Sequence, residues 1–166
     1  MSKQVITTIE PSEPSTELLN MLKADHDKIK ELFEQFERTA DQEERGAIIR
    51  SALKGLEVHA ELEEKIFYPA IRERLRDDKR ITASFEEHHL VHLLINELKV
   101  ARVKLERRDA KFTVLAENVK QHIKQEEESL FLEALAIDLN WESLSTKVEK
   151  RKTQLESQES YLNPRH

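Results

Sequence analysis

The chain has 166 residues, of which 36% are Asp, Glu, Lys or Arg, and its formal net charge is −6. The absence of cysteine excludes disulfides, thiolate zinc sites and iron–sulfur clusters. The negative charge argues against nucleic acid as a partner, because phosphate binding needs clustered Lys and Arg, and no apolar run approaches membrane-spanning length.

Glycine and proline are scarce, with two and four residues respectively, whereas Glu, Lys, Leu and Ala are abundant. This composition is typical of long helices joined by short connections. Because charged residues are frequent and aromatic residues make up only 5%, each helix is expected to bury one apolar stripe and expose the rest. The length fits a single domain.

The first segment, residues 1–14, contains two prolines and no helical period, so we expect a flexible arm. It has no apolar core like that of a signal peptide, which makes the cytoplasm the expected location. Ser15 or Thr16 is expected to cap a first helix that ends near Thr39.

The second helix is predicted to start at Asp41, because Glu44 follows three residues later as in a capping box. Its apolar stripe continues to about Leu75. Pro69 lies inside it and is expected to kink it, since the proline ring removes one backbone hydrogen bond. The charged segment 76–80 is expected to form a turn.

The third helix is predicted over 81–107, with Leu105 in its buried stripe, and Asp109 is expected to cap a fourth. A short fifth helix is expected from about 140 to 158. The predicted fold is all-α, an antiparallel up-down four-helix bundle with a short additional C-terminal helix. The expected divisions are a flexible arm over 1–14, the bundle over 15–139, and a C-terminal helix and tail over 140–166.

The chain repeats itself across two helical hairpins. His59-x-x-x-Glu63 in the second helix aligns with His122-x-x-x-Glu126 in the fourth, and His26 of the first helix aligns with His88 of the third. Residues four apart lie on one face of a helix, so each pair is directed to one side. The two hairpins should therefore pack as pseudo-twofold partners around a shared centre.

These histidines and glutamates lie on or beside the apolar stripes, so they are expected to point inward. An unpaired buried carboxylate is costly, and a buried histidine tends to stay neutral. Two bound cations would resolve both problems. Imidazole and carboxylate together suit iron, zinc or manganese, so ligand type alone does not choose the metal.

The sequence resembles the hemerythrin-like, or HHE cation-binding, proteins over roughly residues 18–136. The matching motifs, in order, are His26, His59-x-x-x-Glu63, His88-x-x-x-His92 and His122 followed by Glu126-Glu127. Each motif is weak alone, but four in order on four predicted helices are a specific signal. The segment HAELEEKIFYP, residues 59–69, is similar to the second-helix signature of the family.

The resemblance implies two non-haem iron ions with an oxo or hydroxo bridge. By it, His26 and His59 would hold one iron, and Glu63 and a carboxylate after His122 would bridge the two ions. The other iron would be held by three histidines, namely His88, His92 and His122. The iron with two histidines would keep an open position for a small molecule such as dioxygen, peroxide or nitric oxide.

Two ligand assignments stay open at this point. The second bridging carboxylate is Glu127 if the spacing of oxygen-carrying hemerythrins applies, and Glu126 if the bacterial spacing applies. A regular helix favours Glu126, because the fifth residue rotates away by a further ~100°, and a π-bulge would bring Glu127 back. For His92, some relatives keep only the His88 equivalent.

The expected function is binding or sensing of dioxygen or a related small ligand. The alternatives are an enzyme with catalase-like peroxide removal or iron oxidation, and a structural or iron-responsive metal-binding bundle. Tyr68 and Phe131 are expected to be packing residues, His89 a surface residue, and Glu64 a residue that could orient a ligand from outside. Neither a partner protein nor the oligomeric state is indicated.

Overall fold

A computed structural model describes residues 10–75, 78–100 and 104–162, with side chains described up to residue 158. The all-α prediction is confirmed, since these residues contain helices and no strand. The elements are listed here in chain order: α1 Glu13–Arg38, α2 Gln42–Leu62, η1 Glu63–Phe67, α3 Tyr68–Arg72, α4 Lys79–Leu98, α5 Leu105–Gln125, η2 Glu126–Leu130, α6 Phe131–Leu135 and α7 Trp141–Leu162.

The first helix begins earlier than predicted. The Ser12 hydroxyl accepts a hydrogen bond from the backbone N–H of Ser15 at 3.4 Å, so Ser12 is the cap and α1 starts at Glu13. Pro14 is tolerated there because the N–H groups of the first helical turn have no partner within the helix. Of the predicted arm, residues 1–9 lie outside the described part of the chain.

The cap of the second helix is confirmed, since the Asp41 carboxylate accepts from the backbone N–H of Glu44 at 2.8 Å. The predicted third helix is too long, because α4 ends at Leu98 and α5 already starts at Leu105. The side chain of Leu105 is exposed and not buried as predicted. No proline or glycine occurs between Leu98 and Leu105, so the sequence carried no turn signal for this boundary.

Asp109 does not cap a helix. It lies in the first turns of α5 and accepts hydrogen bonds from Arg45 at 2.8 Å and from Arg108 at 2.9 and 3.0 Å. The interaction ties the start of α5 to the start of α2. The predicted turn over 76–80 is described only from Asp78, which precedes α4.

Two π-helical turns interrupt the long helices at equivalent places in the repeat. In η1 the N–H of Tyr68 bonds to the carbonyl of Glu63, and in η2 the N–H of Phe131 bonds to that of Glu126. The predicted kink at Pro69 therefore takes the form of a π turn just before the proline. Because η2 contains no proline, the proline alone does not explain these turns. Such turns frequently mark functional sites.

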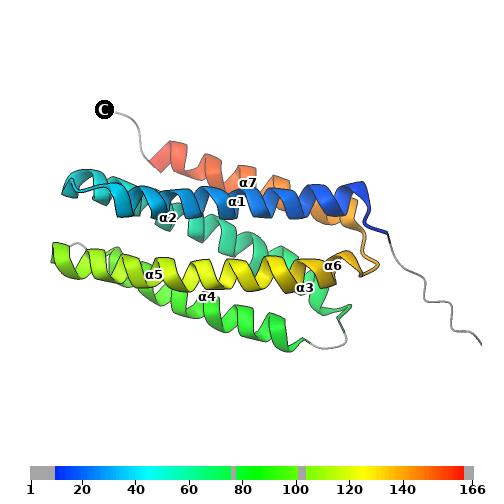
Figure 1. The fold of residues 1–166 in the computed structure, drawn as a ribbon. Helices are drawn as coiled ribbons and strands as arrows, with labels where there is room; N and C mark the ends of the chain where they lie inside the picture. Colours follow the sequence, from blue (N-terminus) through cyan, green and yellow to red (C-terminus); the bar gives the residue numbers. More distant parts are fainter. Residues whose placement is uncertain (1–9, 76–77, 101–103, 163–166) are drawn as a thin grey trace, which may run out of the picture.

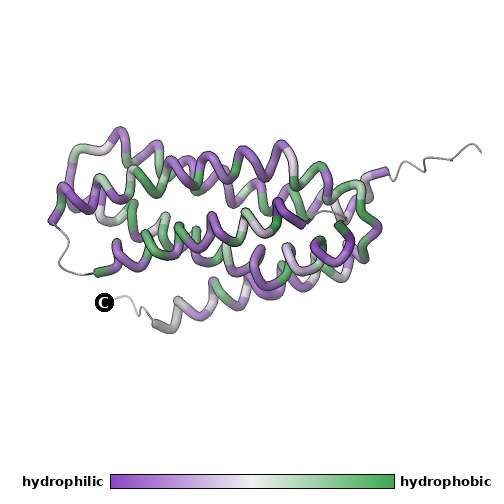
Figure 2. The backbone as a smooth tube through the Cα atoms, turned by 90° about the horizontal axis from the view of Figure 1, so that it is seen from below, coloured by the Kyte–Doolittle hydropathy of each residue, from purple (hydrophilic) through white to green (hydrophobic). Residues whose placement is uncertain are grey.

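The elements assemble into five rods, because α2, η1 and α3 follow one another without a break, as do α5, η2 and α6. Figure 1 shows successive rods reversing direction, with α7 beside α1. Hydrophobic positions recur along every rod without forming one long run (Figure 2). In the described part of the chain, no helix combines the length and apolar character needed to cross a bilayer.

Two apolar clusters fill the interior and leave a polar layer between them. One contains Ile29 and Phe33 of α1, and the other contains Leu18 and Leu22 of the same helix. His26 lies between these two pairs in sequence and is buried. The apolar clusters thus enclose the layer that holds the histidines.

Candidate metal centre

The residues of the repeat meet in this layer from four rods. His26 comes from α1, His59 from the end of α2, His88 from α4 and His122 from α5. Glu63 and Glu126 are the first residues of η1 and η2, respectively. Because the step from each histidine to its glutamate is α-helical, both side chains of each pair stay on the inner face.

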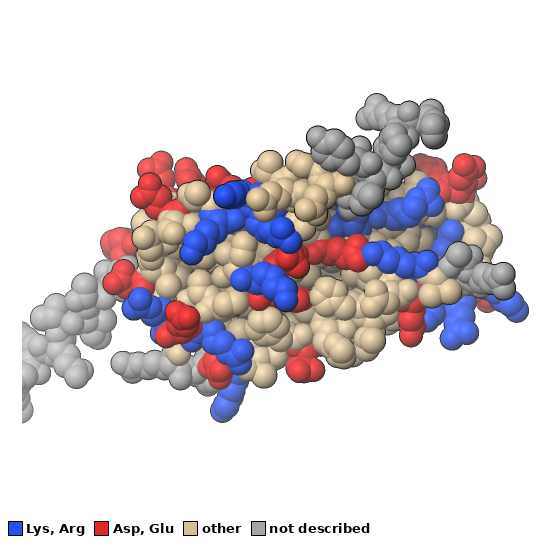
Figure 3. Space-filling view, turned by 180° about the vertical axis from the view of Figure 1, so that it is seen from behind, with Lys and Arg blue, Asp and Glu red and all other residues tan. Residues whose placement is uncertain are grey.

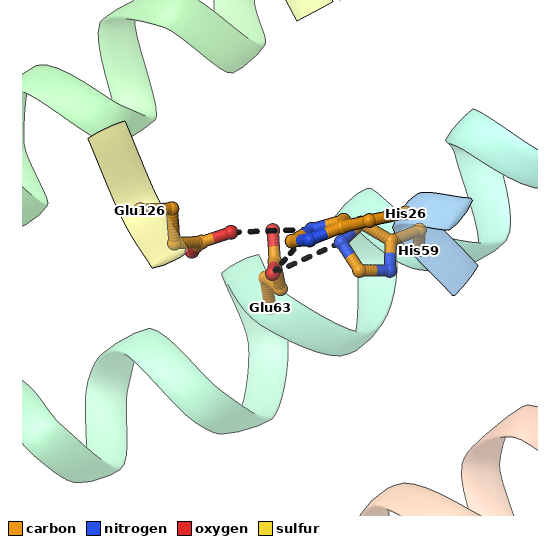
Figure 4. Close-up of side chains that lie close together, drawn as sticks. All are labelled: His26, His59, Glu63 and Glu126. Atoms are coloured by element: carbon orange, nitrogen blue, oxygen red, sulfur yellow. Dashed lines mark ion pairs between the residues drawn. The ribbon is translucent and has the colours of Figure 1, made fainter. Parts of the chain in front are cut away.

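The first group of metal-ligating atoms comes from His26, His59, Glu63 and Glu126, all of them buried. The Nε2 atom of His59 lies 3.0 Å from Oε1 of Glu63. The Nε2 atom of His26 lies 3.3 Å from Oε2 of Glu126. Figure 4 shows these four side chains converging on one point between the helices.

The second group consists of Glu63, His88 and His122. The Nε2 atoms of the two histidines lie 3.1 Å apart, and that of His88 lies 3.4 Å from Oε2 of Glu63. Glu63 thus faces the first group with one carboxylate oxygen and the second group with the other. The arrangement suits a carboxylate shared by two cations.

Several of these buried atoms have no hydrogen-bond partner among the described residues. They are Nε2 of His26, both ring nitrogens of His59, Oε1 of Glu63 and Oε2 of Glu126. Two pairs of them approach within 3.0–3.3 Å without the alignment of a hydrogen bond. Unsatisfied buried polar atoms are costly, and cations bound between them would remove that cost. The residues present therefore fit a metal centre.

A carboxylate stands behind each inner histidine. The distances from the Nδ1 atoms to these carboxylates are 2.7 Å for His26–Glu127, 3.6 Å for His59–Asp25, 2.9 Å for His88–Glu64 and 2.5 Å for His122–Glu87. For His26, His88 and His122, a carboxylate accepting from Nδ1–H keeps the proton there and leaves Nε2 free to bind a metal, whereas Asp25 is an ion-pair neighbour of His59 and not its hydrogen-bond acceptor. Glu64 had been expected to orient a ligand, whereas Asp25 and Glu87 were not anticipated.

Two of the residues predicted as ligands lie outside both groups. Glu127 contacts the far nitrogen of His26, while Glu126 faces the centre. His92 binds Oε1 of Glu64 through its own Nε2 at 2.8 Å, and its side chain is 39% exposed. The structure brings the other six predicted ligands together. His89 is exposed, as expected.

Tyr68 takes a larger part than the packing role expected of it. Its buried hydroxyl lies 2.7 Å from Oε1 of Glu126 and 3.0 Å from Oε2 of Glu63. It is also 3.4 Å from the Nε2 atoms of His88 and His122. The sequence holds one signal for this role. The equivalent position in the second hairpin is a phenylalanine, so the two halves differ here by one hydroxyl.

In the metal-free centre, charge and burial compete. Burial opposes protonation of His59, but the carboxylates of Glu63 and Asp25 outweigh it and raise the pKa of His59 to about 10. The same balance, with Glu63 and Glu64, raises the pKa of His88 to about 9. Burial opposes ionisation of Glu63, yet the two histidines hold its pKa well below the usual range. A metal ion must therefore displace protons to bind.

Two cavities adjoin the centre. A small one of about 20 Å³ lies against the four inner histidines, and its remaining wall is made of Ile29, Leu56, Ala60, Val91, Val119 and Ile123. The other, of about 160 Å³, lies between α4 and the α5–η2 rod and reaches His122 and Glu126. One is apolar and the other has several polar side chains in its wall.

Comparison with known proteins places the chain in a family. A protein of Nostoc sp. (strain PCC 7120 / SAG 25.82 / UTEX 2576) named DNA nickase is 25% identical over 112 residues, which are 68% of this chain and 32% of that protein. The chain thus spans about a third of that relative's length. No solved structure gave a significant match. The family model for the hemerythrin HHE cation binding domain matches residues 17–134, well over half of the chain, and the protein therefore belongs to the hemerythrin HHE family that its motifs resemble.

Proposed function

We propose that this protein holds two non-haem iron ions, joined by an oxo or hydroxo group, and binds or senses dioxygen or a related small ligand such as peroxide or nitric oxide. One observation carries the proposal. Glu63 is shared by two buried groups of metal-ligating atoms, as a carboxylate between two cations would be. Family membership favours iron among the metals that such ligands suit.

The proposed ligand set is smaller than the one that the resemblance implied. His26 and His59 would hold one ion, His88 and His122 the other, and Glu63 would lie between them. Glu126 would serve as the second shared carboxylate, since its Oε2 is 3.3 Å from Nε2 of His26 and 3.8 Å from that of His122. Glu127 would orient His26, and His92 would hold Glu64, which in turn orients His88.

The architecture proposed for this function is an antiparallel up-down bundle over 15–139. It consists of α1, the α2–α3 rod, α4 and the α5–α6 rod. The helix α7, within 140–166, would be an addition to this bundle.

The small apolar cavity supports an uncharged ligand. About 20 Å³ is room for roughly one water-sized molecule, and the wall other than the histidines is hydrocarbon. The ligand set points the same way. Ferritin-like oxygen-activating centres use more carboxylates, whereas neutral histidines stabilise ferric iron less and favour binding over oxidation.

The rival function is enzymatic, with catalase-like peroxide removal or iron oxidation at the same centre. The larger pocket favours it, because serine and glutamine side chains lead from the surface to His122 and Glu126. The hydroxyl of Tyr68 is a hydrogen-bond donor beside both shared carboxylates. A structural or iron-responsive bundle is the third candidate, and the cavity beside the histidines, which has room for a small ligand, argues against a purely structural site.

The deciding experiment is anaerobic reconstitution with ferrous iron, followed by metal analysis and absorption spectra before and after exposure to air. About two irons per chain, with bands that appear in air and fade on deoxygenation, would support dioxygen binding. Bands that persist, together with oxygen evolution from added peroxide, would favour the enzyme. Tight zinc without iron uptake would contradict both.

We propose a small molecule as the partner, with no nucleic acid or membrane, and the cytoplasm as the location. Lys and Arg are interspersed with Asp and Glu over the face seen in Figure 3, without a broad basic patch there. DNA nicking is not proposed for this chain, because the aligned part covers 32% of the protein so named.

A further inference from the structure

A pocket of about 160 Å³ leads from the surface to the candidate metal centre. Arg80 and Gln125 at its outer part are exposed, whereas His122 and Glu126 at its inner part are buried. We propose, on the basis of the proposed function, that this pocket is the entrance by which small uncharged molecules, of the size of nitric oxide or hydrogen peroxide, reach the centre.

Two other cavities near the centre are less suited to such a path. The 20 Å³ cavity beside the histidines is lined only by buried residues. A cavity of about 210 Å³ between α1, α2 and α7 reaches Asp25 but contains none of the proposed ligands in its wall. There Lys152 of α7 binds the Asp25 carboxylate at 2.6 Å. On the side covered by α7, the Lys152–Asp25 ion pair therefore lies between this cavity and His59.

The wall of the entrance suits uncharged molecules that form hydrogen bonds. Ser84 and Ser129 supply hydroxyls from α4 and η2, and Gln125 supplies an amide. Arg80 at the outer end is paired with Glu133 at 3.2 Å, so its charge is balanced. A polar wall lets an entering molecule exchange hydrogen bonds with water one at a time, which lowers the cost of desolvation.

The volume also makes the entrance simple to block. Ser84 is 7% exposed and lies on the α4 face that carries His88 one turn later. A leucine at this position would project its branched side chain into the pocket, because the other surroundings of residue 84 are close-packed and leave no room for it. Ser129, on the opposite wall, permits the same substitution from a different helix.

The test uses the full chain loaded with ferrous iron and follows nitric oxide binding by stopped-flow absorption. In Ser84→Leu and in Ser129→Leu, the association and dissociation rate constants should both fall by about tenfold, with Kd within about twofold of the wild type. Ser84→Ala removes the hydroxyl without filling the pocket and, because nitric oxide accepts hydrogen bonds only weakly, should leave both rates for this probe nearly unchanged. Gln121→Leu, on the exposed face of α5, is the control for an added leucine.

Iron content and helicity are measured for every variant, and the two leucine variants are independent, so misfolding of one leaves the other as a test. Unchanged rates in a folded, iron-loaded leucine variant would overturn the entrance. So would a slower association with an unchanged dissociation rate, because the substitution would then act on the bound state. A wild-type chain that takes up no iron, or binds iron but no nitric oxide, would overturn the proposed function as well.

Discussion

The hydroxyl of Tyr68 donates a hydrogen bond to Oε1 of Glu126 at 2.7 Å and so joins the two helical hairpins through two buried side chains. The contact depends on the π turn that precedes Tyr68. In such a turn residue i+5 bonds back to residue i, which carries Tyr68 over Glu63 and toward the opposite hairpin. One phenol thereby lies beside both carboxylates that we propose as shared ligands.

Replacing Tyr68 with phenylalanine removes only this oxygen. The two buried carboxylates then lose the single phenolic proton that lies between them, 2.7 Å from Glu126 and 3.0 Å from Glu63, and the metal-free protein should be less stable by about 1–3 kcal/mol. Urea unfolding in the presence of a chelator measures the change. A double-mutant cycle with Glu126→Gln should show that most of the loss in stability depends on Glu126. If the free-energy changes of the two substitutions were simply additive, this contact would be contradicted.

Replacing His88 or His92, which both lie on α4, tests which of the two histidines binds a metal ion. His88→Ala should reduce the bound metal from about two ions per chain to about one, because Nε2 of His88 belongs to the second group. His92→Ala should keep about two ions per chain, since His92 contacts Glu64. Metal analysis after dialysis gives both values. Loss of a whole ion in His92→Ala would restore His92 as a ligand.

The adjacent pair Glu126 and Glu127 permits a similar comparison. Glu126→Gln should abolish tight binding at one position of the centre, because a shared carboxylate oxygen is lost. Glu127→Gln removes only the partner of His26 Nδ1, so affinity should fall by about 10- to 100-fold with the stoichiometry unchanged. Titration with Co(II), followed by absorption, measures both. The reverse order of effects would assign the bridge to Glu127.

The metal-free protein should lose stability as the pH rises above neutrality. The pKa of His59 is raised from 6.5 to about 10 and that of His88 to about 9 in the folded chain, so their stabilising contribution is complete below pH 6.5 and lost toward pH 9–10. The depressed pKa of Glu63 has the opposite sign, and its contribution is lost as the pH falls below its ordinary 4.5.

Urea midpoints measured with a chelator should therefore be highest between about pH 4.5 and 6.5 and decline on the alkaline side. The alkaline decline in the midpoint should be shallower in His59→Ala. The control His89→Ala, at an exposed position, should show the same decline as the wild type. A midpoint that rises steadily from pH 7 to 9 would show that the two histidines are not charged in the metal-free fold.

Lys152 fastens α7 to the first helix. Its ammonium lies 2.6 Å from Asp25, and the two side chains are only 18% and 11% exposed. Lys152→Met leaves the mostly buried Asp25 carboxylate without its cation, so the free energy of unfolding should be roughly 1–3 kcal/mol lower than that of the wild type. Lys150→Met, on the exposed side of α7, is the matched control. Equal stability of the two variants in thermal or urea unfolding would remove Lys152 from this role.

Relations within one helix were predictable from the residues alone. The cap at Asp41 follows from a short side chain that can accept from a free N–H of the first helical turn. The common face of His59 and Glu63 and the inward direction of the repeat follow from the 3.6-residue period, which depends on backbone geometry and not on neighbours. The histidine motifs, spread over four helices, also pointed to the family.

Relations between helices needed the packed chain. His88, Val91 and Ile95 occupy the buried stripe of α4, and His92 lies at its edge, where the rotation of α4 against its neighbours turns it toward Glu64. The choice of Glu126 over Glu127 depends on where the π turn begins, and the role of Tyr68 depends on an added backbone residue in that turn. Such rotations and offsets are set by side-chain packing among distant segments, which the helical period does not encode.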